Sequence, residues 1–235
     1  MLRFDGPDTQ TFLQGQLTNN INALTATRSQ YSGYCTPKGR LLATFLLWQK
    51  DGAYFMMMPR VLCEPLRKRL SMYILRAKVK ASDVSDELAL FGVTGGMPES
   101  IAVTAPGLSH EVLHHGGVSV IHLPIERNLV IAAAAAAAHV EASFAASSPA
   151  SPPALWDALD IEAGIPSVVP ATQEQFVPQT VNFDLIGAVS FDKGCYPGQE
   201  IVARTHYLGK LKQRMVRARI ASGDAPAPGD KLYTA

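Results

Sequence analysis

One stretch, residues 192–214, holds most of the side chains that could do chemistry, and it reads DKGCYPGQEIVARTHYLGKLKQR. Cys195 lies between two glycines, and Lys193 is two positions before it. Residues 196–199 suit a tight turn, because proline presets φ at one central position and glycine accepts a positive φ at the next. A helix can then begin at Gln199, which places Cys195 just before a helix N-terminus. Both the helix end and the lysine favour the thiolate form.

This setting predicts a functional thiol at Cys195, acting as a nucleophile, a redox partner or a transient ligand of metal or sulfur. The alternative is a small buried residue in a glycine-rich turn, and the residues alone favour neither interpretation. Cys35 and Cys63 lack such surroundings and are predicted to be structural.

Three further polar residues, Glu200, Arg204 and His206, follow the cysteine. Glu200 and Arg204 are four positions apart, so a simple surface pair on a helix explains them as well as a site does. His206 does not share a helical face with Arg204 and is predicted to lie beyond the helix. The sequence shows no Ser/His/Asp pattern, no paired carboxylates, no zinc spacing and no glycine-rich phosphate loop.

The elements that must hold this stretch are helices and short strands in mixed order, which is typical of an α+β protein. Apolar spacing predicts a helix near the N-terminus, with Phe12, Leu13, Leu17 and Ile21 on one face, and helices over 61–72, 133–144 and 155–163, the last ending at Gly164. Strands are predicted over 29–34, 41–48, 53–58, 73–79, 88–94, 118–123, 128–132 and 215–220, with a hairpin at 41–58. His114 and His115 are expected in an exposed turn, and 147–153 as a linker.

The composition is that of an ordinary globular protein. The chain has 235 residues, of which 47% are hydrophobic and 17% charged, and its net charge is +1. This balance gives no global reason to expect nucleic-acid or anionic-membrane binding. Three widely spaced cysteines fit reduced thiols, no apolar run reaches the ~20 residues that span a bilayer, and the N-terminus lacks a targeting segment. These features predict a soluble, cytoplasmic protein.

Residues 193–200 closely resemble the K-G-C-[FY]-x-G-Q-E signature of the YgfZ family of folate-binding proteins, which are relatives of a mitochondrial iron–sulfur assembly factor. The continuation Ala203-Arg204-Thr205-His206 fits as well. Residues 12–18 and 38–42 also look like parts of that family. Residues 161–166 resemble a segment of the wider superfamily, which includes the glycine-cleavage T-protein, an aminomethyltransferase that uses tetrahydrofolate.

The resemblance implies two interleaved α+β subdomains, one of them ferredoxin-like, over residues 1–215. Residues 216–235 would begin a C-terminal β-barrel that is largely absent. The resemblance also implies a pocket for tetrahydrofolate or a derivative. Glu162 is the first choice to hold the pterin, since a carboxylate can accept two donors from its amino-pyrimidine edge. Arg214 is a weaker candidate for a folate contact, because it matches only an arginine-rich stretch near the folate of the T-protein. Further candidate folate contacts are Tyr196, Gln199 and Glu200, and the reactive group would be Cys195 with Lys193, Arg204 and His206 around it.

One departure from the T-protein bears on enzymatic activity. That protein carries an aspartate pair in the strand after its first turn, and one member is catalytic. The corresponding positions here are Ala43 and Thr44. Neither can hold a negative charge or take up a proton at neutral pH. The departure disfavours aminomethyl transfer and leaves open whether the chain is an enzyme.

The leading hypothesis is a folate-binding accessory protein for assembly or repair of iron–sulfur clusters, which would affect tRNA modification through iron–sulfur enzymes. Its partners would be a reduced folate and iron–sulfur assembly proteins or client enzymes. The alternatives are a folate-dependent one-carbon transferase and a non-enzymatic module that docks through the Cys195 loop. Direct tRNA binding is the weakest option, because the cations at 210, 212, 214, 217 and 219 alternate as on a solvated strand face.

Overall fold

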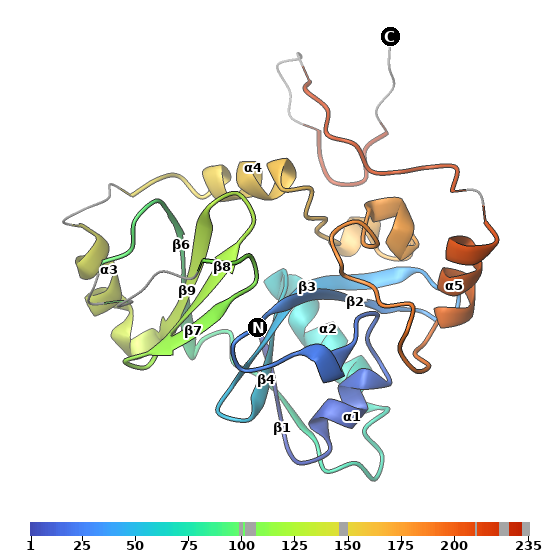
Figure 1. Ribbon diagram of the computed structural model, residues 1–235, viewed down its shortest axis with the longest axis horizontal. Helices are drawn as coiled ribbons and strands as arrows, with labels where there is room; N and C mark the ends of the chain where they lie inside the picture. The colour runs from blue at the N-terminus through green and yellow to red at the C-terminus, as the bar shows by residue number, and fades with distance from the viewer. Residues whose placement is uncertain (99–100, 102–106, 146–149, 210, 221–225, 232–235) are drawn as a thin grey trace.

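The computed structural model describes residues 1–98, 101, 107–145, 150–209, 211–220 and 226–231 (Figure 1). They form two antiparallel sheets, one of five strands and one of four. The first sheet has the strand order β2-β3-β4-β1-β5, made of β1 (Leu2–Asp5), β2 (Gln30–Cys35), β3 (Leu41–Lys50), β4 (Ala53–Met57) and β5 (Lys80–Asp83). The second has the order β6-β9-β8-β7, made of β6 (Leu88–Thr94), β7 (Val112–His115), β8 (Val118–Leu123) and β9 (Arg127–Ala133). The predicted α+β class is confirmed.

The long strand β3 is buried on both faces, which explains its unbroken apolar run. Phe45 and Leu47 point into a core that includes apolar residues of helices α1 (Thr9–Gln14) and α2 (Arg60–Ser71). Leu46 and Trp48 point into the other core, which includes residues of the second sheet and of the segment 168–202. The predicted β3–β4 hairpin is confirmed: Asp51 and Gly52 both have positive φ, as the favoured two-residue hairpin turn requires.

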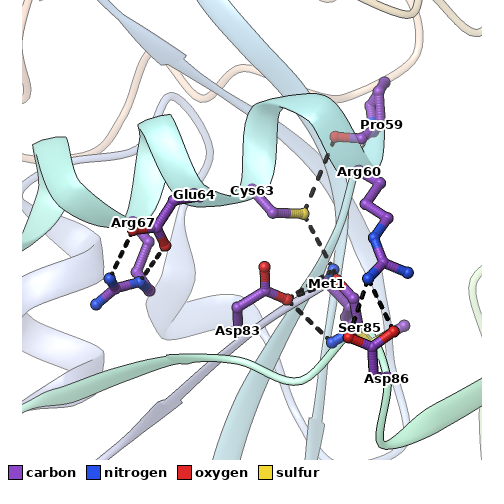
Figure 2. A network of polar contacts seen from close by, with 9 residues as sticks. All are labelled: Met1, Pro59, Arg60, Cys63, Glu64, Arg67, Asp83, Ser85 and Asp86. Carbon is purple, nitrogen blue, oxygen red and sulfur yellow. Dashed lines mark hydrogen bonds and ion pairs between the residues drawn. The ribbon is translucent and has the colours of Figure 1, made fainter.

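Helix α2 is tied to its surroundings by an exposed ion pair and by the buried Cys63 thiol, which accepts from the N-terminal ammonium of Met1 at 3.0 Å (Figure 2). Arg60 binds both carboxylate oxygens of Asp86, at 2.8 and 2.9 Å, and Arg67 binds Glu64 within the helix. Cys63 is buried beneath the helix, and Cys35 is buried at the end of β2. Both positions suit the structural role that the sequence suggested for these two cysteines.

Four sequence-based predictions about elements were wrong. Residues 73–79 form turns and irregular backbone without a partner strand among the described residues, and β5 begins only at Lys80. The N-terminal helix ends at Gln14, although Leu17 and Ile21 reach the same core from the turns beyond it.

His114 lies in β7, where its ring bonds Ser119 and the carbonyls of Ala26 and Gln49; the turn itself is Gly116-Gly117. Residues 215–220 have no partner strand in the described part of the chain.

The remaining helices cover the second sheet and the far end of the molecule. They are α3 (Ala137–Ala145), α4 (Ala154–Glu162) and α5 (Gln199–Tyr207). Four residues of the predicted linker, 146–149, lie outside the described residues, as do Lys210 and parts of 216–235. Within the described residues, no helix is both long and apolar enough to cross a membrane.

Candidate functional site

We call residues 193–200 the Cys195 loop. Within it, residues 196–199 form a type II turn that leads directly into α5, as the sequence predicted. The amide of Gln199 donates to the Tyr196 carbonyl at 3.1 Å, and Gly198 has φ 82° and ψ 2°. Gly198 is also the N-cap of α5 and supplies no capping side chain. The first turn of the helix therefore keeps backbone N–H groups free of a side-chain cap beside the loop.

Two glycines let this loop lie directly on the turn that connects β2 and β3. A Cβ atom on Gly198 would come within 2.4 Å of the Thr36 carbonyl oxygen and 2.6 Å of the Gly39 amide nitrogen. Gly39 has φ 69°, and a Cβ atom added to it would come within 3.0 Å of the Ile201 side chain of α5. The close approach of two backbones fixes the height of the loop above the first sheet.

Lys193 is the internal anchor of the loop. Its ammonium donates to the carbonyls of Gln14, Leu17 and Asn19 at 2.6, 2.5 and 3.1 Å. Gln14 is the last residue of α1, so its carbonyl belongs to the group that helix ends leave without intrahelical partners. The side chain is only 8% exposed, and this burial lowers the pKa of Lys193 to about 8. The lysine is thus engaged by the scaffold, which differs from the expected role as electrostatic neighbour of the thiol.

Tyr196 and Gln199 also serve the loop itself. The Tyr196 ring is buried 5.0 Å from the Lys193 ammonium, and burial raises the pKa of its hydroxyl well above the usual value. The Gln199 amide donates to the Lys193 carbonyl at 3.3 Å. Both side chains also line the neighbouring depression, while the Tyr196 ring faces the Lys193 ammonium and the Gln199 amide donates back into the loop.

Cys195 is exposed in this loop, so the alternative of a small buried residue is wrong. It lies in an open depression of about 400 Å³ at the first turn of α5. The walls are Pro37, Cys195, Tyr196, Gly198, Gln199, Glu200 and Ala203.

The polar residues beyond the cysteine occupy the outer face of α5. Glu200 and Arg204 form the surface pair that their spacing allowed, at 3.2 Å, and both are exposed. His206 lies within α5 and not beyond it, which corrects the prediction. Its ring stacks on Phe191 with centroids 3.7 Å apart and touches the edge of Tyr207. Neither Arg204 nor His206 lines the depression at Cys195.

Glu162 stands elsewhere, at the last position of α4. In Figure 1, α4 lies above the second sheet and α5 at the far right. The Glu162 side chain is 56% exposed, with Arg217 as a distant partner at 3.9 Å. Arg214 forms two bonds to Asp184, at 2.8 and 2.7 Å. Neither Glu162 nor Arg214 lines the depression, so the predicted site residues fall in two separate places.

Ala43 and Thr44, which occupy the positions of the T-protein aspartate pair, make structural contacts in β3. Thr44 is buried in β3, and its hydroxyl accepts the Val168 amide at 2.9 Å. Its neighbour Ala43 pairs with Tyr34 in the sheet. Nothing at this position can take up a proton at neutral pH, which agrees with the expectation from the sequence.

A buried charge on β9 was missed by sequence reasoning. Arg127 is fully buried and binds Asp160 of α4 at 2.6 Å. The signal was an arginine directly before an apolar strand, but its partner is 33 residues away and no local spacing connects them. No cluster of three or more metal-binding side chains occurs among the described residues.

Comparison with known proteins gives this arrangement a family. No family model matches the chain. The tRNA-modifying protein YgfZ of Photorhabdus laumondii is 34% identical over 234 residues, which cover 97% of this chain and 70% of that protein. The protein of the same name from Yersinia pseudotuberculosis is 31% identical and is covered to 72%.

Among solved structures, the glycine cleavage system aminomethyltransferase T of Bartonella henselae has the same fold. Its TM-score is 0.72 at 13% identity, over 87% of this chain. The chain spans 60% of the length of that protein. Because a relative above 30% identity matches 97% of this chain and is itself covered to 70%, and because residues 193–200 form one docked loop, this chain belongs to the YgfZ family.

Proposed function

We propose that this protein is a folate-binding accessory protein that supports iron–sulfur enzymes, including enzymes of tRNA modification, and that Cys195 is its functional thiol. One observation carries the proposal. In the docked loop, Lys193, Tyr196, Gln199 and Gly198 are all used to build and hold the backbone, whereas Cys195 is exposed and lines the depression beside α5. A loop that served only packing would not need to present a cysteine to solvent.

The relatives named tRNA-modifying protein support the connection to tRNA modification. The iron–sulfur role follows from the family resemblance of the loop. A thiol at an electropositive helix end can bind a soft metal or a sulfur species, which is the chemistry that cluster assembly or repair requires.

For the folate, Glu162 is the residue of this chain that fits best. Its carboxylate has an accessible surface and, among the described residues, one distant cationic partner, so it can accept two donors from a pterin. Glu200 is paired with Arg204, Arg214 is held by Asp184, and Tyr196 and Gln199 each contact Lys193 within the loop. A bound reduced folate would supply a one-carbon carrier; the chain supplies the carboxylate that orients it.

Thermal unfolding tests the folate proposal. At about 100 times the Kd, tetrahydrofolate should stabilise the native state by about 2.7 kcal/mol, which is roughly 5–10 °C for a chain of this size. Glu162→Gln should reduce this shift, and Glu141→Gln, an exposed residue of α3, should not. Absence of a shift with every reduced folate would contradict the proposal.

The thiol is tested in cells that lack the native protein. Cys195→Ser should keep the melting temperature, because the side chain is exposed, yet lose its support of iron–sulfur enzyme activity. If Cys195→Ser supports these enzymes fully, the loop is a docking surface. Exposed Tyr207 and Leu208 at the end of α5 favour that second candidate, since they offer apolar contacts to a partner protein.

A further inference from the structure

We propose that Arg127 is a positioning residue for Glu162: its buried ion pair with Asp160 fixes α4 on the second sheet and thereby sets where the Glu162 carboxylate stands. The inference rests on the proposed role of Glu162 in folate binding. It concerns a residue of β9 that lies outside the loop signature and is far from Glu162 in sequence.

The Arg127 guanidinium is enclosed by groups that fix its orientation. Its side chain is 0% exposed, Nη2 donates to Asp160 at 2.6 Å, and Nε donates to the Pro124 carbonyl at 3.1 Å. The guanidinium carbon lies 4.6 Å from the centre of the Trp156 ring. Arginine is rarely buried so fully unless it is paired, and an unpaired charge at this depth would be strongly destabilising.

Helix α4 has little else to hold it. None of its nine residues, all described by the structure, is fully buried, so the helix lacks the apolar stripe by which most helices pack. Trp156 provides its main apolar contact, lying so close to Gly92 of β6 that a Cβ atom there would be 2.3 Å from the ring. Together with this contact, the Arg127–Asp160 pair determines the placement of α4.

Asp160 connects this anchor to the end of the helix. Its backbone carbonyl accepts the Ile165 amide at 2.9 Å, while the Gly164 amide donates to Ile161 at 3.1 Å. With Gly164 at φ 67°, these bonds form a Schellman motif. Glu162 lies between the anchored residue and the cap. A shift of the Asp160 side chain therefore moves the backbone that carries the Glu162 carboxylate.

The pair lies where three parts of the fold meet. Arg127 comes from the second sheet, Asp160 from α4, and Tyr31 approaches from β2 of the first sheet. Burial, with a smaller contribution from the Asp160 carboxylate, raises the pKa of Tyr31.

Tetrahydrofolate affinity, measured by calorimetry on the full chain, tests the inference. Asp160→Asn should weaken binding about tenfold, because coupled neighbouring residues typically interact by that order. In a Glu162→Gln background, the same substitution should change affinity less than twofold, while it lowers the unfolding midpoint equally in both backgrounds. Amide exchange across α4 should be faster in Asp160→Asn before any folate is added.

Two further variants keep the test decisive. Arg127→Met/Asp160→Leu removes both charges without leaving one unpaired, so it should fold and still lose about tenfold in affinity. Asp86→Asn, which breaks the exposed pair with Arg60, should leave affinity unchanged. Unchanged affinity in Arg127→Met/Asp160→Leu would overturn the inference, as would equal losses in both Glu162 backgrounds. Unchanged affinity in Glu162→Gln alone would instead overturn the folate contact of the proposed function, and this inference with it.

Discussion

At the scale of single residues, Lys193 illustrates how a buried charge can hold a functional loop. Desolvation lowers its pKa from 10.5 to about 8, whereas the three carbonyls around the ammonium stabilise the charged form and oppose that change. The side chain therefore titrates in a range where the folded and unfolded states bind different numbers of protons.

This titration predicts the sign of a pH effect. Between pH 8 and 10.5 the unfolded chain keeps the Lys193 proton and the folded chain loses it, so the lysine's contribution to the unfolding free energy rises with pH across this window. Below pH 8 both states are protonated and the contribution is constant. Urea unfolding of the wild type and of Lys193→Met between pH 7 and 10 measures this contribution as the difference between their unfolding free energies at each pH. A flat difference would show that the carbonyls dominate.

Thr44 provides a second prediction at this scale. Thr44→Val removes the acceptor for the buried Val168 amide and should lower the unfolding free energy by about 1–3 kcal/mol. Thr44→Ser keeps the hydroxyl and is the matched control, with a smaller loss expected. Equal losses in the two variants, measured by chemical denaturation, would mean that the methyl group and not the hydrogen bond matters at this position.

At the scale of elements, the union of the Cys195 loop with the β2–β3 turn depends on glycine. Gly198→Ala should cost more than about 2 kcal/mol, because an alanine is strained at φ 82° and its Cβ would collide with the Thr36 carbonyl. Gly194→Ala, in the same loop but with open space around its Cα, should change stability by less than about 0.5 kcal/mol. Similar losses for both glycines, measured by denaturation, would contradict the docked geometry.

Sequence patterns predicted the elements whose signals are local. The turn at 196–199, the start of α5, the β3–β4 hairpin and the glycine after α4 each depend on proline, glycine or apolar spacing within a few residues. Residues 73–79 and 215–220 were misjudged because apolar alternation shows only that a segment could pair. Whether a neighbouring strand is present depends on the tertiary fold.

The contacts of the site were predictable only in part. The Cys195 loop was recognised from its residues, but Lys193 was assigned to the thiol because the two are only two positions apart in sequence. Its real partners lie more than 170 residues away. The Arg127–Asp160 pair is similarly non-local. Such contacts are set by how the sheets and helices pack, which composition and spacing do not encode directly.

At the scale of the whole molecule, the two sheets share one apolar core. Residues of both sheets and of the segment 168–202 belong to it, including Trp48, Ile131 and Phe183, and Trp156 packs at its edge. The chain therefore is expected to unfold in one cooperative transition even though its sheets are distinct.

The two tryptophans of the chain make this testable. In Trp156→Phe, the remaining Trp48 reports on the core between the sheets. In Trp48→Phe, the remaining Trp156 reports on α4. In each variant, the midpoint from fluorescence should coincide with the midpoint from far-UV circular dichroism. An earlier fluorescence midpoint for Trp156 would show that α4 separates before the sheets unfold.

The cage around Lys193 also gives the loop a proteolytic signature. Trypsin must take a lysine side chain into its specificity pocket before it cuts the following bond, yet the Lys193 ammonium is already bound by three carbonyls and its side chain is 8% exposed. Cleavage between Lys193 and Gly194 therefore requires the loop to leave α1. The rate of that one cut reports how often the cysteine-bearing segment opens in the otherwise folded protein.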